Sequence, residues 1–276
     1  MKRKINLWLA THQTLSTVLF SFLMVGLYFF LDLAVGILWW GNLLIVLAMA
    51  FAWCFYVVTR KAALMNGALS YLSEDCDPRP MLELLGDILK YKSSPAVREL
   101  DLMNYANYLI MLDGYEEKGR DMLLRLDIDK YYANQPFARL SYYGIISAIE
   151  YERADANASL HLKMAEDILK AECERSKRMN ITLSEIAKTI EITKAIYEEK
   201  DLRRAIELIG ERESKTLFEK VGDAHLLGEC YIGLGEAEKA REQLKFVLEN
   251  GNKLSLVSSA KKMLEGLEGG EKTQEM

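Results

Sequence analysis

The sequence predicts an all-α protein in which an N-terminal two-helix transmembrane hairpin is followed by an α–α solenoid of paired helices. Two observations carry this prediction. The 46 residues from Thr14 to Thr59 contain one formal charge, Asp32, whereas the rest of the 276-residue chain is rich in charge. From residue 60 onward, apolar residues recur at the spacing of amphipathic helices, and no run of alternating β-branched residues is present.

The uncharged segment is too long for one membrane span. As a single helix its 46 residues would extend about 69 Å, whereas the hydrocarbon core of a bilayer is ~30 Å thick. We therefore predict spans at about 14–31 and 37–58, with Asp32 in the turn, because a carboxylate at mid-membrane costs about 2.5–3.5 kcal/mol. A cleaved signal peptide is the alternative, and the length of the first apolar run and the second run behind it argue against it.

Basic residues predict the orientation of this hairpin. Lys2, Arg3 and Lys4 precede the first span, Arg60 and Lys61 follow the second, and the turn contains neither Lys nor Arg. Because cytoplasmic flanks carry the excess of Lys and Arg, we expect a two-span protein of the cell membrane with both termini in the cytoplasm. The turn of about five residues leaves almost nothing outside to recognise a large extracellular ligand.

Charge and cysteine content exclude several classes of protein. Of the formal net charge of −5, residues 1–59 account for +2, so residues 60–276 carry −7. An acidic body lacks the basic footprint of a nucleic-acid-binding protein, so no nucleic acid is expected as a partner. The four cysteines show no CxxC spacing and are expected to be buried free thiols in a reducing cytosol.

The remaining chain is expected to form one helical domain over 60–268, followed by a mobile tail at 269–276. The second span is expected to continue to about Leu72, and short polar turns separate the later helices, which makes successive helices antiparallel neighbours. The expected helices lie at about 80–91, 96–112, 115–126, 136–152, 156–178, 183–199, 202–212, 216–233, 236–249 and 255–267.

One helix pair near the C-terminus has a specific pattern of large and small residues. Its members are Ala224, Leu227, Gly228, Tyr231, Leu234, Gly235, Ala240, Leu244 and Val247. This pattern resembles the tetratricopeptide repeat, with Ala224 in place of the usual Trp. Ala205 lies 35 residues before Ala240, close to the ~34-residue period of that family. The resemblance covers about 95–250 and is sharp over 221–250. An irregular helical bundle with one repeat-like hairpin is the alternative.

The sequence offers no catalytic motif. It contains no P-loop, GxGxxG, GxSxG or HExxH pattern. Of the three histidines, His12 lies at the membrane edge, His161 is expected at the surface of a charged helix, and His225 does not share a helix face with Cys230. We therefore expect no enzyme activity, no cofactor and no metal site.

The resemblance to tetratricopeptide repeats implies a binding function. In that family the first helix of each pair lines a concave groove, and its exposed positions contact extended peptides. Transferred to this sequence, those positions are Lys194, Tyr197, His225, Glu229 and Ile232. A groove with Lys194, Tyr197 and His225 would hold an acidic or C-terminal peptide carboxylate. The alternative is that these residues are solvated positions on a stacking helix.

These features together lead to one functional expectation and two alternatives. We expect a membrane-anchored cytoplasmic scaffold that binds a protein or peptide partner, while the hairpin contacts the lipid bilayer. The alternatives are a peptide-responsive regulator, whose solenoid changes curvature on binding, and an accessory subunit of a membrane transport, secretion or envelope complex.

Overall fold

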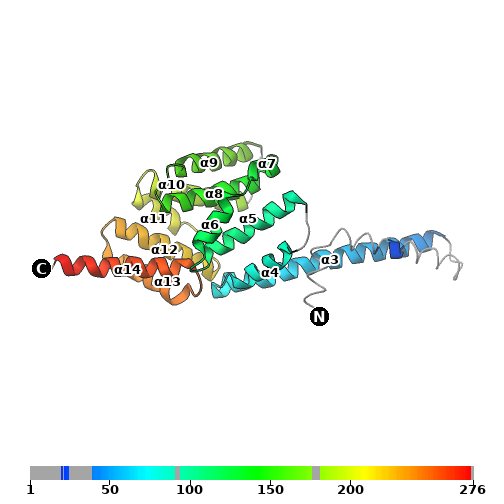
Figure 1. The fold of residues 1–276 in the computed structure, drawn as a ribbon, viewed down its shortest axis with the longest axis horizontal. Coiled ribbons are helices and arrows are strands. Elements are labelled where there is room, and N and C mark those ends of the chain that lie inside the picture. Colours follow the sequence, from blue (N-terminus) through cyan, green and yellow to red (C-terminus); the bar gives the residue numbers. More distant parts are fainter. Residues whose placement is uncertain (1–19, 21, 25–38, 91–93, 176–180, 275–276) are drawn as a thin grey trace. The chain divides into compact units, whose positions relative to one another are not determined.

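The computed structural model describes residues 20, 22–24, 39–90, 94–175 and 181–274. Apart from one isolated β-bridge, the regular structure in these ranges is helical (Figure 1). The helices are α3 (Trp39–Asp75), α4 (Arg79–Leu89), α5 (Pro95–Met111), α6 (Glu116–Leu124), α7 (Ile128–Tyr132), α8 (Pro136–Glu152), α9 (Ala158–Arg175), α10 (Ile181–Tyr197), α11 (Leu202–Gly210), α12 (Leu217–Gly233), α13 (Ala237–Asn250) and α14 (Ser255–Gln274).

The chain divides into two compact units, which we describe separately. Unit 1 comprises Met1–Ala68 and Lys90–Ser93, and unit 2 comprises Leu69–Leu89 and Ser94–Met276. The predicted all-α class is confirmed for the described residues. The predicted boundary at residue 60 falls inside α3, because this helix continues from the apolar segment without a break.

Helix α3 provides one stretch that is long and apolar enough to cross a membrane. It covers the 29 residues Leu47–Asp75 of α3, and no residue of its most apolar window is buried. The described residues therefore supply one candidate span and not the two of the predicted hairpin. Apart from Phe20 and 22–24, the predicted first span at 14–31 lies outside the described residues.

The described part of the first apolar segment contacts α3. The ring of Phe20 stacks on Trp53 with 4.7 Å between the ring centroids and 6° between the planes. Met24, one helical turn further on, is buried, whereas Phe22 and Leu23 are exposed. An apolar side chain that is buried at every third or fourth position marks one face of a helix.

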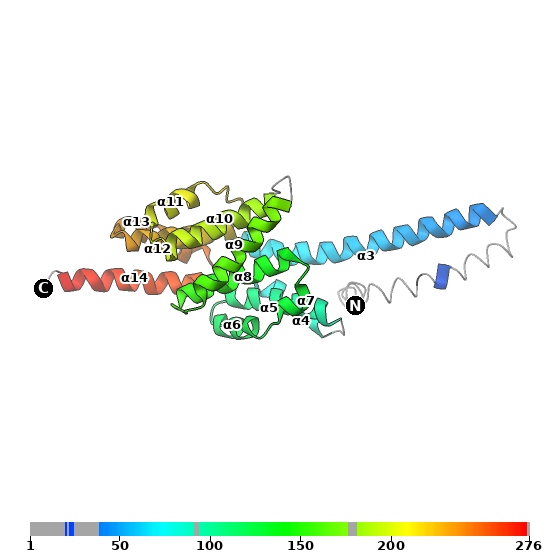
Figure 2. The same ribbon diagram turned by 90° about the horizontal axis from the view of Figure 1, so that it is seen from above.

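Unit 2 consists of helices packed in consecutive antiparallel pairs, namely α5 with α6, α8 with α9, α10 with α11, and α12 with α13 (Figures 1 and 2). The short helix α7 was not predicted. The side chain of Asp127 caps it by accepting a hydrogen bond from the backbone N–H of Lys130, and its residues Ile128 and Tyr132 are buried. A five-residue helix is too short for apolar periodicity to reveal it.

A left-handed residue recurs in the turns between helices. All positive φ angles of the described residues fall in such connections, at Cys76, Gly114, Ala154, Lys200, Gly235 and Asn252. In three pairs the residue after it, Asp155, Asp201 or Glu236, donates a backbone hydrogen bond of 2.9 Å to a carbonyl near the end of the preceding helix. This is the backbone pattern that ends helices at a left-handed residue. The same turn is therefore built with glycine in some pairs and without it in others.

Small residues let the two helices of a pair approach closely. A Cβ atom on Gly119 would lie 2.6 Å from the carbonyl oxygen of Ala106, and one on Gly228 would lie 2.7 Å from Leu244. Ala205 and Ala240, which lie five residues after their left-handed turn residues, are fully buried, as predicted for the crossing points.

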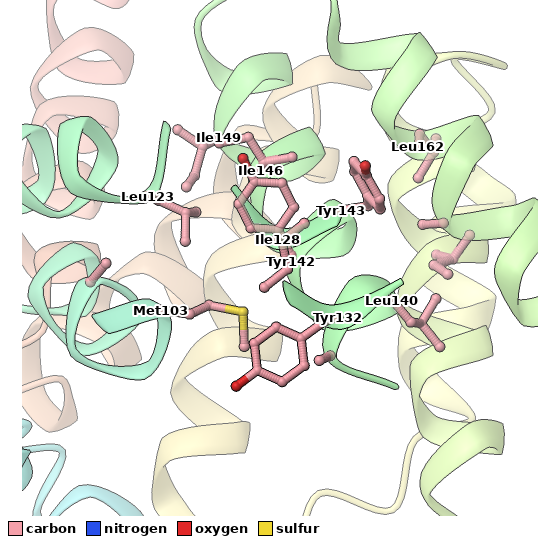
Figure 3. Packing of buried hydrophobic residues seen from close by; sticks show 14 residues of the cluster. Met103, Leu123, Ile128, Tyr132, Leu140, Tyr142, Tyr143, Ile146, Ile149 and Leu162 are labelled. Carbon is pink, nitrogen blue, oxygen red and sulfur yellow. The ribbon is translucent and has the colours of Figure 1, made fainter. Parts of the chain in front are cut away.

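Three apolar clusters form the core of unit 2. The largest joins α5 to α10 and is rich in aromatic rings, with Tyr132, Tyr142 and Tyr143 among its buried members (Figure 3). The second includes Leu72 and Cys76 from the end of α3 together with residues of α12, α13 and α14. The third lies between α10, α11 and α12. The end of α3 is thus part of the core of the helical domain.

The first and last helices of unit 2 are joined through the loop between α13 and α14. The backbone N–H of Asp113 donates to the carbonyl of Lys253 at 3.1 Å, and Nδ2 of Asn252 donates to the carbonyl of Asp75 at 2.7 Å. Leu112 and Leu254 form an antiparallel bridge. In an open repeat array each unit contacts only its neighbours, so this domain departs from that arrangement.

Two further expectations concern the C-terminus and the cysteines. Helix α14 continues to Gln274 and so includes most of the segment that we expected to be a mobile tail. All four cysteines are free. Cys76 and Cys230 are buried as predicted, but Cys54 is exposed on α3 and Cys173 is only partly buried. Burial raises the pKa of Cys76 to about 11 and that of Cys230 to about 12, so both thiols stay protonated.

Candidate functional site: the inner groove

Three adjoining pockets form one hollow, which we call the inner groove. Their volumes are about 280, 450 and 780 Å³. The first two share Gly144, Ile145 and Thr189, and the last two share four residues, namely Glu152, Phe218, His225 and Leu256. The lining comes mainly from α8, α10, α12 and α14, with α5 and α6 at one end. The first helix of each of the four pairs therefore faces this groove.

One end of the inner groove is apolar because α8 carries a glycine there. A Cβ atom on Gly144 would meet nothing within 4 Å, so the missing side chain leaves open space. Apolar side chains surround this space, and the hydroxyl-bearing residues Ser141, Ser147, Thr189 and Thr193 line its edge. The apolar lining consists of Leu140, Ile145, Leu162, Ile186 and Ile190.

Acidic side chains lie next to the apolar end. Glu152, at the last position of α8, keeps an exposed surface in the groove, but the protein atoms around it partly desolvate its carboxyl group, and this desolvation together with the charge of Glu229 raises its pKa. Glu229 is partly buried and accepts a hydrogen bond of 3.2 Å from the hydroxyl of Tyr197. Burial also raises the pKa of Glu229, against the opposing effects of Tyr197 and Lys200. Two carboxyl groups with raised pKa values are therefore neighbours, and within the part of the chain that the structure describes no cation is paired to either.

Most basic side chains of the inner groove are already engaged. Arg153 pairs with Glu117, and Arg212 pairs with Asp223 at 2.9 Å. Nζ of Lys188 donates to the carbonyl oxygen of Glu211 at 3.2 Å. Among the described residues, Nε of Arg120 is buried and has no hydrogen-bond partner. The groove thus presents acidic side chains, the exposed ammonium of Lys215 in the 780 Å³ pocket, and one guanidinium N–H of Arg120 without an acceptor.

His225 lies at the centre of the inner groove but is buried in its wall. Its side chain is 6% exposed, and Nε2 lies 2.9 Å from the hydroxyl of Ser259 on α14. Burial lowers the pKa of His225 to about 4. The imidazole is therefore neutral near pH 7, and it links α12 to α14.

The five sequence-predicted binding residues do not form one cluster. Tyr197 and Glu229 are hydrogen-bonded to each other, and His225 lines the groove nearby. Lys194 instead forms an ion pair with Glu166 of α9 at 2.8 Å, and Ile232 packs against the second core cluster. Lys194, Tyr197 and His225 therefore do not converge on a carboxylate, because one is paired elsewhere, one donates to an acid and one is neutral.

Sequence reasoning missed two features near this site. Tyr151 stacks on Tyr197 with 5.2 Å between the ring centroids, and its hydroxyl donates to Glu198 at 2.6 Å. His161, expected at the surface, is partly buried and lies 2.7 Å from Oε2 of Glu150, a carboxylate that is 3% exposed. The charged neighbours of His161 in the sequence concealed its partner, because that partner lies on the adjacent helix α8.

The fold and the inner groove define an all-helical protein with stacked antiparallel helix pairs and a concave surface built from the first helix of each pair. Comparison with protein-family models, with curated proteins and with solved structures finds no match for this chain. Among the described residues, no group of three or more His, Cys, Asp or Glu side chains is placed to hold a metal ion.

Proposed function

We propose that this chain is a membrane-anchored scaffold of the tetratricopeptide-repeat type, whose cytoplasmic helical domain binds a segment of a partner protein in the inner groove. The observation that carries the proposal is the origin of the lining. Each of α5, α8, α10 and α12, the first helices of the four pairs, contributes to one continuous hollow. Concave faces built in this way are the binding surfaces of helical-repeat proteins.

The proposed anchor is the apolar hairpin of two spans. Support comes from the exposed apolar stretch of α3, from the stacking of Phe20 on Trp53, and from the basic residues that flank the apolar segment. Just after the predicted second span at 37–58, the guanidinium of Arg60 lies 5.3 Å from the ring centroid of Tyr56. An aromatic ring beside a basic side chain is typical of the headgroup layer. Anchoring would raise the effective concentration of a membrane-bound partner.

The structure of the helical domain bears differently on the two alternative functions, a peptide-responsive regulator and an accessory subunit. A regulator whose solenoid changes curvature needs ends that are free to move, and here the loop at 251–254 is bonded to both α5 and the end of α3. This closure disfavours the regulator. An accessory subunit of a membrane complex remains compatible with the fold, and its partner would contact the hairpin instead of the inner groove.

Site-specific photocrosslinking in cells tests the proposal with the full chain. A photoreactive amino acid at Glu185, which is exposed in the groove, is expected to capture a partner and give a discrete adduct. The matched control is the exposed Lys163 on the outer helix α9, which should give none. Adducts from the hairpin but none from Glu185 would favour the accessory subunit and contradict the scaffold.

A further inference from the structure

Building on the proposed function, we infer the chemistry of the partner: the inner groove binds a linear segment in which an apolar side chain neighbours a Lys or Arg. The apolar side chain enters the space at Gly144, and the cation lies beside Glu152. Both positions are on α8, two turns of helix apart, and both line the 450 Å³ pocket.

The expectation that an apolar side chain of the partner enters the groove follows from the space at Gly144. The helix exposes no Cβ there, and nothing lies within 4 Å of the position that a Cβ would occupy. The space is bounded by aliphatic side chains from three helices, among them Leu140, Leu162 and Ile190. Burying an aliphatic or aromatic side chain in such a space removes apolar surface from water, so the space is suited to hold one anchor residue of a partner.

The expectation that a Lys or Arg of the partner lies beside Glu152 follows from the negative charge next to that space. Glu152 faces the groove, its neighbour Glu229 is partly buried, and among the described residues no cation is paired to either. Each carboxylate raises the energy of the other, and a cation between them removes that repulsion. Lys200 acts on Glu229 without an ion pair to it, and its ammonium lies over the Tyr197 ring at 6.0 Å.

Most of the remaining cations of the groove are not available to an acidic partner, and the exposed Lys215 lines only the 780 Å³ pocket, where its charge acts on Glu219. Arg153 and Arg212 are held by Glu117 and Asp223, and His225 is neutral. Arg120 retains one buried N–H without an acceptor at the far end of the groove. A backbone carbonyl of an extended segment is sufficient to satisfy this donor.

The test uses a library of random linear dodecapeptides displayed on phage and selected against the full chain in lipid nanodiscs. Empty nanodiscs remove the peptides that bind lipid. We expect the selected sequences to carry Lys or Arg within one or two positions of Leu, Ile, Met or Phe. Selection of acidic sequences, or of sequences without a basic residue, would overturn the inference.

Two variants locate the bound peptide. Gly144→Leu places a side chain in the apolar space, where a Cβ meets nothing within 4 Å, and is expected to weaken binding of a selected peptide at least about tenfold, or about 1.4 kcal/mol. Gly266→Leu is the matched control, because Gly266 lies on α14 outside the three pockets and a Cβ there also meets nothing within 4 Å. Equal binding by both variants would show that the peptide lies elsewhere and would contradict the inference.

A separate substitution, with its own control, tests the role of the carboxylate of Glu152. Glu152→Gln is expected to weaken a peptide that carries Lys about threefold to tenfold and to leave its Lys→Met analogue unchanged. Glu242→Gln, at an exposed position of α13, should change neither. The photoreactive amino acid at position 185 can capture a partner in cells while the library yields no peptide whose binding depends on Gly144 or Glu152. In that case the scaffold function stands and the inferred chemistry is wrong. If Glu185 captures only a second copy of this chain, the groove is a self-association surface and the inference also fails.

Discussion

At the scale of single residues, two polar side chains in the interior of the helical domain, Glu150 and His225, are each paired with a partner on a neighbouring helix. His225 on α12 is hydrogen-bonded to Ser259 on α14, and His161 on α9 pairs with the buried Glu150 of α8. Such contacts align one helix against the next, and they place titratable groups where solvent cannot stabilise their charge.

His225 is expected to make the stability of the protein depend on pH. Its pKa is lowered from 6.5 to about 4 by burial, so between these values the unfolded chain binds a proton that the folded chain does not. This contribution is complete above pH 6.5 and is lost as pH falls toward 4, with a magnitude of about 3 kcal/mol.

Chemical denaturation at pH 7 and pH 5 measures this effect by comparison of the wild-type protein with His225→Gln, whose amide retains a polar group beside Ser259. We expect the variant to lose less stability than the wild type over this interval. An equal loss in both proteins would mean that His225 does not carry the pH dependence.

The pair formed by His161 and Glu150 makes a second prediction. His161→Ala removes the hydrogen-bond partner of a carboxylate that is 3% exposed, and the free energy of unfolding should fall by about 2 kcal/mol. Glu150→Leu combined with His161→Ala removes both polar groups and should cost less than the sum of the two single changes. A double-mutant cycle measured by urea unfolding gives the coupling, and additive effects would show that the pair is not coupled.

At the scale of elements, the repeat is conserved in backbone geometry more than in residue type. Gly235 of α12–α13 and Gly114 of α5–α6 have φ angles of 75° and 77°. Ala154 and Lys200 occupy the same turn position in the other two pairs with φ angles of 53° and 56°. A residue with a Cβ costs roughly 1 kcal/mol in this conformation, so the surrounding pair must impose it.

A reciprocal substitution tests this equivalence of the turns. Ala154→Gly relieves a strained, exposed position and should raise the midpoint of thermal unfolding, with a gain of up to about 1 kcal/mol. Gly235→Ala introduces the same strain and should lower stability by about 1 kcal/mol. Effects of the same sign in the two variants would contradict a shared turn geometry.

The same turn geometry explains why the sequence revealed one helix pair clearly and the others less well. The pair at α12–α13 was recognisable because Gly228, Gly235 and Ala240 all have the residue types that their positions favour. In α8–α9 the turn residue is Ala154 and the buried polar residue is Ser147, so neither position carries the glycine that makes the α12–α13 pair recognisable. Gly144 is instead open to the inner groove.

The site could be predicted only in part for a related reason. Transfer from the repeat family placed five residues on the groove; of these, His225 lines it, whereas Tyr197 and Glu229 are hydrogen-bonded to each other outside its lining. The residue pattern does not reveal partners on other helices. The pairing of Lys194 with Glu166 and the burial that keeps His225 neutral depend on tertiary contacts, and both argue against the acidic ligand expected from the sequence.

At the scale of the helical domain, the contacts of the 251–254 loop convert an expected open array into a closed one. They are made largely by backbone atoms, from Lys253 to Asp113 and to Cys76, and a side-chain pattern gives no indication of them. The second core cluster reinforces the closure, because it contains Leu72 and Cys76 of α3 together with Val221, Leu254 and Ala260. Helix α14 and the loop before it therefore connect the beginning of the helical domain to its C-terminal helix pair.

Deletion of the 251–254 loop together with α14 gives the prediction that best distinguishes an open helical array from a closed one. A chain that ends at Asn250 lacks the loop and α14, so the end of α3 and the C-terminal half of α5 lose their contacts with Asn252, Lys253 and Leu254. Hydrogen exchange by mass spectrometry in nanodiscs should show lower protection at 69–76 and 103–111 as well as in α12 and α13. In an open array the loss would be confined to α12 and α13, because each unit depends on its neighbours only. Asn252→Gly is the milder comparison: it keeps α14 and the turn conformation, removes one hydrogen bond to Asp75, and should reduce protection at 69–76 alone.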